Sequence, residues 1–322
     1  METSKKIIKY IETKGQVTAT DLSNFLAISR QAVHKQLNNL LEDGRLYKVG
    51  KPPKVFYLLA QSKTRLSAVQ IEPPLKKLID ENFLIITSAG EKMEGLEGFI
   101  YWCGKQKLPV EKTTIEYERT LSKYFQHKKD GLIDGMYKIK HTFPEVFLDK
   151  LFYLDFYSIE RFGKTKLGQL LLYAKQSQDR TLIKELVDKL RPQITGLLER
   201  FKIDAVAYVP PTVKREVQLM KELERMLSLP MPALNLVKMK TPVAVPQKTL
   251  NKLEDRVENA KSTIVVDDDR KYGTILLLDD ALGSGATMNE IARKIKNQNL
   301  AQTVIGLAIT GSFSGFEVIS EV

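Results

Sequence analysis

Hydrophobic positions recur at helical spacing near the start of the chain, and two strand-like runs follow them. The spacing predicts three helices: Ser4 to Thr13, a second capped by Thr20, and a third from about Arg30 to Glu42. Ser29 is placed as the N-cap of the third helix. The strand-like runs cover residues 45–49 and 55–59 and predict a hairpin. The buried stripe of the third helix would be Val33, Leu37, Leu40 and Leu41.

The second half of the chain alternates apolar runs with amphipathic segments. Buried strands are predicted over 204–209, 275–278 and 303–309, with a short last piece over 316–322. Helices are predicted up to Leu190, from about Glu216 and over 288–296. This order predicts an α/β domain with a doubly wound, mostly parallel sheet. Its ligand would bind at the carboxyl ends of the strands, where residues 210–215 and 281–287 would meet.

The region between these two parts has weaker signals. A helix over 75–81, a strand over 83–88 and an amphipathic helix over 112–126 are predicted. Residues 98–103 contain an aromatic cluster, which favours a core or dimer contact over a base-stacking surface. We therefore predict three parts: a winged-helix domain over 1–62, a connecting region with a possible dimerisation role over 63–149, and the α/β domain over 150–322.

Composition narrows the classes of function. The 322 residues include one cysteine, Cys103, which excludes an internal disulfide framework and a cysteine-clustered zinc site. No apolar run reaches membrane-spanning length and the N-terminus lacks a signal-peptide core, so we expect a cytoplasmic protein without a membrane partner. The net charge of +11 indicates polyanionic partners, either nucleic acid or phosphorylated small molecules.

The basic charge is concentrated in residues 1–60, which hold ten lysines and arginines against five acids. Three helices followed by a basic hairpin resemble the winged helix-turn-helix of bacterial transcription regulators. This resemblance implies double-stranded DNA as a partner, with the third helix in the major groove and the hairpin on an adjacent phosphate strand. A protein-interaction module with a solvated lysine surface is the alternative. The candidate DNA-binding residues are Ser29, Arg30, Gln31, His34, Lys35, Asn38, Lys48, Lys51 and Lys54.

The strongest chemical signal is the segment T-I-L-L-L-D-D-A-L-G-S-G-A-T over 274–287. A buried strand leads into two adjacent acids, a loop of small residues and a helix. Backbone N–H groups at such a helix entry favour a phosphate monoester, and the acids suit the vicinal hydroxyls of a ribose. A Walker A loop is excluded because its lysine is missing, and the third glycine of a Rossmann fingerprint is also missing. The alternative is a plain buried strand with two solvated carboxylates.

The same segment resembles the signature of type I phosphoribosyltransferases for phosphoribosyl diphosphate (PRPP). The resemblance implies that Asp279 and Asp280 hold the ribose hydroxyls. The 5′-phosphate loop would comprise Ala281, Leu282, Gly283, Ser284, Gly285, Ala286 and Thr287. Residues 209–215 are similar to the pyrophosphate loop of that fold, which implies pyrophosphate contacts for Pro211, Lys214 and Arg215.

Residues 246–259 are similar to the mobile loop of the competence-protein-F (ComF-like) branch of the family. This similarity implies site roles for Gln247, Lys248 and Arg256, and Tyr173–Lys175 resemble a lysine-bearing segment of the same branch. The zinc ribbon of that branch is absent from this sequence. The family would use Mg²⁺, held through PRPP rather than by protein ligands.

Two functions follow as hypotheses. In the first, a DNA-binding regulator, expected to be a homodimer, senses PRPP or a nucleoside monophosphate through its phosphoribosyltransferase-like domain. In the second, that domain is an active transferase that moves ribose 5-phosphate from Mg-PRPP to a base or ammonia. Its catalytic residues would be Asp279, Asp280, Arg215, Lys248 and Arg256, and the winged helix would recruit the enzyme to nucleic acid.

Overall fold

The computed structural model describes residues 2–51, 53–60, 71–213, 215–243, 245 and 249–312. Several predicted features lie outside the described residues: Lys214, Gln247, Lys248, the side chain of Lys51 and the strand piece over 316–322. The chain forms two compact units, one from residues 1–71 with 100–111 and the other from 72–99 with 112–322. Each unit is described by itself.

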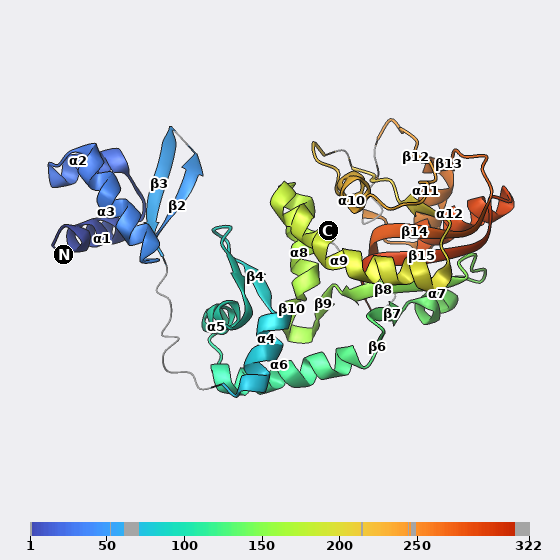
Figure 1. The fold of residues 1–322 in the computed structure, drawn as a ribbon, viewed down its shortest axis with the longest axis horizontal. Helices are drawn as coiled ribbons and strands as arrows, with labels where there is room; N and C mark the ends of the chain where they lie inside the picture. Colours follow the sequence, from blue (N-terminus) through green and yellow to red (C-terminus); the bar gives the residue numbers. More distant parts are fainter. Residues whose placement is uncertain are drawn as a thin grey trace. The chain divides into compact units, whose positions relative to one another are not determined.

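The N-terminal unit contains the three predicted helices and the predicted hairpin (Figure 1). Its helices are α1 (Glu2–Lys14), α2 (Ala19–Leu26) and α3 (Arg30–Glu42). Strands β1 (Val17–Thr18), β2 (Leu46–Lys51) and β3 (Lys54–Leu59) form an antiparallel sheet in the order β1-β3-β2. The predicted stripe is confirmed for Val33, Leu37 and Leu40, which pack with Ile7, Ile11 and Leu22 in one buried cluster.

The start of α2 corrects one prediction. The N-cap of α2 is Thr18 rather than Thr20, because Thr18 has an extended backbone and forms a reciprocal capping box with Asp21. Its hydroxyl accepts from the Asp21 N–H at 3.2 Å, and the Asp21 carboxylate accepts from the Thr18 N–H at 2.8 Å. Thr20 lies inside the first turn of the helix.

Within the described residues, a six-stranded sheet in the order β11-β14-β15-β8-β7-β6 forms the centre of the second unit. Its strands are β6 (Lys128–Lys129), β7 (Leu132–Asp134), β8 (Lys150–Phe156), β11 (Ala205–Tyr208), β14 (Tyr272–Leu282) and β15 (Ala301–Gly311). The strands β11, β14, β15 and β8 are parallel, and β7 and β6 add an antiparallel edge. The prediction of a mostly parallel sheet is confirmed.

Helices cover both faces of this sheet. On one face, α8 (Lys166–Ser177), α9 (Arg180–Phe201) and α10 (Leu219–Leu227) pack on alternate residues of β14 and β15, among them Leu276 and Leu278. On the other face lies α12 (Ala286–Asn297). Its Met288 packs closely on Gly306 of β15, since a Cβ added at this glycine would lie 3.3 Å from the methionine sulfur. Helices on both faces leave the carboxyl ends of the strands for a ligand.

The region predicted as a connector contributes structure to this unit. It contains α4 (Pro73–Asn82), β4 (Leu84–Ile86), β5 (Lys92–Glu94), α5 (Gly95–Gln106), α6 (Val110–Phe125) and α7 (Met136–Thr142). Because β6 and β7 belong to the main sheet, the sheet begins near residue 128 and not at the predicted boundary of 150. The predicted core role of its aromatic residues is confirmed for Phe99 and Tyr117, which are buried with ring centroids 5.3 Å apart.

Short elements complete the second unit. They are β9 (Ser158–Ile159), the 3₁₀ helix Glu160–Phe162, β10 (Gly163–Lys164), β12 (Leu236–Lys238), α11 (Leu253–Thr263) and β13 (Ile264–Val266). Strands β12 and β13 pair antiparallel, so Lys238 at the end of β12 lies opposite Ile264 at the start of β13. This strand pair and α11, which lies between the two strands in the chain, bring two basic side chains to the site described next.

Candidate functional site

The two adjacent acids lie within β14, near its carboxyl end. The predicted strand over 275–278 continues to Leu282, because Asp279, Ala281 and Leu282 pair with Ala308, Thr310 and Gly311 of β15. The predicted phosphate loop is therefore shorter than expected. Ala281 and Leu282 belong to the strand, and Ala286 and Thr287 belong to α12. A bend of three residues, Gly283–Gly285, joins the two elements.

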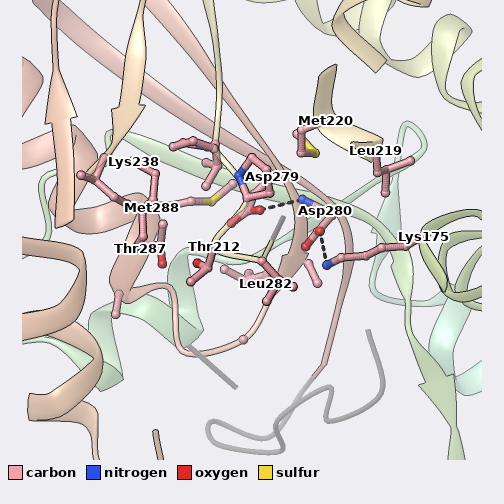
Figure 2. Close-up of a pocket in the computed structure, with 18 of the residues that line it drawn as sticks. Lys175, Thr212, Leu219, Met220, Lys238, Asp279, Asp280, Leu282, Thr287 and Met288 are labelled. Atoms are coloured by element: carbon pink, nitrogen blue, oxygen red, sulfur yellow. Dashed lines mark hydrogen bonds and ion pairs between the residues drawn. The ribbon is translucent and has the colours of Figure 1, made fainter. Parts of the chain in front are cut away.

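A pocket with a volume of about 230 Å³ opens beside this bend (Figure 2). It is lined by both acids, by every predicted residue of the 281–287 segment, and by Pro211, Arg215 and Arg256. The structure thus brings together residues separated by up to about a hundred positions in the chain. Lys175, Thr212, Gln218 and Lys238 also line the pocket. Lys175 and Thr212 lie in segments noted for their resemblance to the family, whereas no sequence motif includes Gln218 or Lys238.

Asp279 and Asp280 form a connected pair at the centre of the pocket. The Asp280 N–H donates to Asp279 Oδ1 at 2.8 Å, and the Lys175 Nζ donates to Asp280 Oδ2. Burial and the neighbouring Asp280 carboxylate raise the pKa of Asp279 well above its usual range. Asp280 therefore forms an ion pair with a lysine, while Asp279 binds a proton more tightly than an exposed carboxyl group.

The bend has the geometry expected of an anion site. Gly285 is the N-cap of α12 and has φ +83°, a conformation that other residues adopt only with strain. The Ser284 hydroxyl accepts from the Ala286 N–H at 3.3 Å. Among the described residues, the N–H groups of Ser284 and Gly285 have no hydrogen-bond acceptor, although Ser284 is buried. Donors of this kind at a helix N-terminus favour a phosphate or carboxylate.

Basic side chains lie on both sides of the acids. Figure 2 shows Lys175 and Lys238 on opposite sides of Asp279 and Asp280. Arg256 is buried, and its Nε donates to the Leu250 carbonyl at 2.7 Å. Its Nη1 is close to Gly283, since a Cβ added at this glycine would lie 3.8 Å from it. Burial lowers the pKa of Arg256. Arg256 therefore lies close to Gly283 of the bend, and its site role stays a prediction.

Arg215 makes a contact that the sequence did not indicate. Its guanidinium donates to the backbone carbonyl of Lys175, near the C-terminal end of α8. Lys175 is thus held at two points, its backbone by Arg215 and its amine by Asp280. A pyrophosphate contact for Arg215, as predicted, would require the guanidinium to exchange this carbonyl for a ligand oxygen.

The Mg²⁺ ion implied by the resemblance stays a prediction, and the oxygen atoms of the acid pair are the groups that bear on it. Among the described residues, no group of three or more His, Cys, Asp and Glu side chains is placed to bind a metal ion. Asp279 and Asp280 offer oxygen atoms, the ligand type that Mg²⁺ prefers, but one of these oxygens already accepts from Lys175. Most of the coordination shell would then come from ligand oxygens and water.

The second candidate surface is on the N-terminal unit. Arg30, Gln31, His34, Lys35 and Asn38 of α3 are exposed, as are Lys48 and Lys54 of the hairpin. Ser29 caps α3 by accepting from the Ala32 N–H at 3.3 Å, so its hydroxyl has a structural role. Opposite the buried stripe, α3 therefore presents a polar and basic face, as the pattern predicted.

Comparison with protein families identifies the N-terminal unit. Residues 2–46 match the family model described as winged helix-turn-helix DNA-binding. The N-terminal unit is a winged helix-turn-helix domain. The match covers the predicted domain up to the start of the hairpin, and the described hairpin β2–β3 supplies the wing. A search of curated proteins finds no match to the chain. None of the described helices is long and apolar enough to cross a membrane.

Proposed function

We propose that the chain is a DNA-binding transcription regulator whose α/β unit binds PRPP or a nucleoside monophosphate with Mg²⁺. The observation that carries the proposal is the position of Asp279 and Asp280 beside the Gly283–Gly285 bend in one pocket. The acids suit the two hydroxyls of a ribose, and the bend suits its 5′-phosphate. The similarity of this segment to type I phosphoribosyltransferases supports the same placement.

A ligand at this position would have to compete with an existing contact. Ribose hydroxyls that donate to Asp280 replace the ion pair with Lys175, which is only partly exposed. A diphosphate group near the acids would offer the released lysine and Arg215 new acceptors. Mg²⁺ would neutralise part of the diphosphate charge. Binding is therefore expected to change the contacts of the C-terminal end of α8.

The helix α8 connects this pocket to the first elements of the unit. At its N-terminal end, Lys166 pairs with Glu94 of β5 at 2.9 Å, and Lys92 of β5 pairs with Glu185 of α9 at 2.6 Å. Burial raises the pKa of Glu94, but hydrogen bonds and charges from Lys92 and Lys166 outweigh it and lower this pKa to about 2. A displaced α8 would thus act on β4, β5 and α4, the elements that follow the winged helix along the chain. This is the route proposed for a ligand effect on DNA binding.

The alternative is an active transferase, favoured by the basic side chains on both sides of the acid pair. A base or ammonia nitrogen would form a bond to the ribose C1 as the bond from C1 to the diphosphate oxygen breaks. Pyrophosphate would leave with Mg²⁺. Carboxylates near the ribose would stabilise positive charge that develops on the sugar. Release of pyrophosphate in the presence of a panel of bases would support this alternative.

Calorimetry tests the shared premise. Mg-PRPP is titrated into the full chain, the Asp279→Asn/Asp280→Asn variant and an Asp269→Asn variant as a matched control at an exposed acid. The proposal expects binding to the wild type and control and a loss of at least tenfold in the double variant. Equal binding by all three proteins, or no binding by the wild type, would contradict it.

A gel-shift experiment tests the regulatory part. DNA fragments from the neighbourhood of the gene are titrated with and without saturating Mg-PRPP. The regulator hypothesis expects a change in DNA affinity on ligand binding, since coupling between two sites is reciprocal. An unchanged affinity, together with pyrophosphate release, would favour the transferase.

A further inference from the structure

Lys238 is a basic residue of the pocket that no sequence motif includes. It ends β12, and its amine donates to Asn259 Oδ1 at 3.2 Å and to Thr263 Oγ1 at 2.5 Å. Both acceptors are on α11, one turn apart, and Arg256 precedes Asn259 by three residues on the same helix. A lysine ammonium has three N–H donors, so one donor is left after these two bonds.

Among the described residues, the charged group that acts on the pKa of Lys238 is another cation. Within the described part of the chain, no carboxylate forms an ion pair with this amine. The positive charge of Lys294 of α12 acts on the Lys238 amine, and Glu290 pairs instead with Arg293 and Lys294. Burial and Lys294 lower the pKa of Lys238 to about 8. A half-buried ammonium in such surroundings is stabilised by an anion from outside the chain.

The position of Lys238 indicates which anion this would be. In Figure 2 the side chain lies beside Thr287 and Met288, at the start of α12 and on the far side of the acids from Lys175. Arg256 lies at the same end, next to Gly283. The bend and the two cations therefore all line the same pocket.

We propose that Lys238 binds the phosphate group held at the Gly283–Gly285 bend and makes the pocket selective for doubly charged phosphate monoesters over uncharged sugars. This inference rests on the anion site of the proposed function and extends it to a residue outside the similarity to phosphoribosyltransferases. A purely structural role, in which Lys238 only ties β12 to α11, is the competing explanation.

The proposal has a consequence for the pH dependence of binding. A bound phosphate dianion raises the pKa of Lys238, so binding takes up a proton at pH values above about 8 and affinity falls as the pH rises further. The other charged groups around this part of the pocket are Asp279, Asp280 and Lys175 at the acids, Arg215 beside Lys175, Arg256 and Lys261 on α11, and Glu290, Arg293 and Lys294 on α12. Burial and Asp280 also raise the pKa of Asp279 toward this pH range, and its protonation weakens hydroxyl binding. The part of the alkaline limb that Lys238→Met removes is therefore the part that reports Lys238.

The experiment compares ribose 5-phosphate, ribose and Mg-PRPP as calorimetric probes of the full chain between pH 7 and 9.5. The variants are Lys238→Met, Lys238→Arg and, as control, Lys240→Met, an equal charge change at an exposed lysine two residues away. We expect Lys238→Met to lose at least tenfold in ribose 5-phosphate affinity and to lose the alkaline limb. Lys238→Arg should retain most of the affinity, and the control should match the wild type.

Thermal unfolding separates the competing explanation. Removing a half-buried charge without a counter-ion should leave the Tm of Lys238→Met unchanged or higher. A lower Tm with unchanged ribose 5-phosphate affinity would overturn the proposal in favour of the structural tie. Wild-type binding of ribose 5-phosphate without binding of Mg-PRPP would contradict the proposed function and leave this inference standing. Binding of neither probe would overturn both.

Discussion

Replacing Gly285 by alanine tests whether the bend after β14 is a built feature of the pocket. With φ at +83°, this position imposes about 1–2 kcal/mol of backbone strain on any residue that carries a Cβ. The new Cβ would also lie 3.2 Å from Ile139 Cδ1, a tight contact that a small shift of this side chain can relieve. Reduced freedom of the unfolded chain offsets about 0.4–1 kcal/mol. The net expectation is a destabilisation of about 1 kcal/mol.

A matched control is available in α9. Gly196 is exposed inside this helix, and a Cβ there meets nothing within 4 Å. Gly196→Ala should therefore stabilise the protein by about 0.5–1 kcal/mol through helix propensity. For a unit of this size, 1 kcal/mol moves the Tm by roughly 2–4 °C. Scanning calorimetry should show the α/β transition shifted down in Gly285→Ala and up in Gly196→Ala.

The same variant should weaken ligand binding. If the bend is displaced, the Ser284 and Gly285 N–H groups no longer point at the same phosphate oxygen position, so at least one hydrogen bond to the ligand is lost. Loss of one hydrogen bond to a charged group costs about 1.5–3 kcal/mol, or roughly 10- to 100-fold in affinity. The reasoning is refuted if Gly285→Ala leaves the Tm and the affinity for ribose 5-phosphate at wild-type values.

Three further predictions concern the acid pair and the winged helix. The folded-state pKa of Asp279 is raised, so the folded protein binds this proton more tightly than the unfolded chain and its stability falls as the pH rises from about 4. In urea unfolding, Asp279→Asn should therefore be more stable than the wild type at neutral pH, and this difference should vanish in acid. A difference in stability that does not change with pH would contradict the raised pKa. Arg30→Ala and Lys35→Ala should each lower the slope of log affinity for DNA against log salt by about one, whereas Lys9→Ala on α1 should not, as checked by salt-titrated gel shifts. Leu37→Ala removes a fully buried side chain from the small winged-helix core, which costs about 2–5 kcal/mol of stability. This variant should lose DNA binding while its heat of Mg-PRPP binding is unchanged. Loss of both activities would show that the two units do not fold independently.

The winged helix could be predicted almost completely, because its signals are local. The stripe at Val33, Leu37 and Leu40 and the cap at Ser29 each depend on residues within four positions. The second helix start was misplaced although the sequence carries the signal, since Asp21 follows Thr18 by three residues as a capping box requires.

The length of β14 and the extent of the sheet were harder to predict. The polar pair Asp279–Asp280 looks like the end of a strand, but its backbone groups pair with a neighbouring strand some thirty residues away. Strand pairing of this kind depends on tertiary contacts that periodicity does not contain. The two- and three-residue strands β6 and β7 are too short to give a period at all.

The acids and the bend of the candidate site were predictable because they are contiguous in sequence. Lys238 and Arg256 reach the pocket from β12 and α11, and Lys175 reaches it from α8. Arg256 and Lys175 were indicated only by the resemblance to the ComF-like branch, and nothing in the neighbours of Lys238 distinguishes it from a solvated lysine. Only the folded chain shows that Lys175 and Lys238 lie on opposite sides of the same two carboxylates.

The most direct test of the central claim is a crystal structure of the full chain with Mg-PRPP or ribose 5-phosphate. The account predicts the 5′-phosphate against the N–H groups of the Gly283–Gly285 bend, the ribose hydroxyls on Asp279 and Asp280, and Lys175 moved away from Asp280. A ligand bound outside this pocket, or bound in it with the Lys175–Asp280 ion pair intact and the bend empty, would contradict the account.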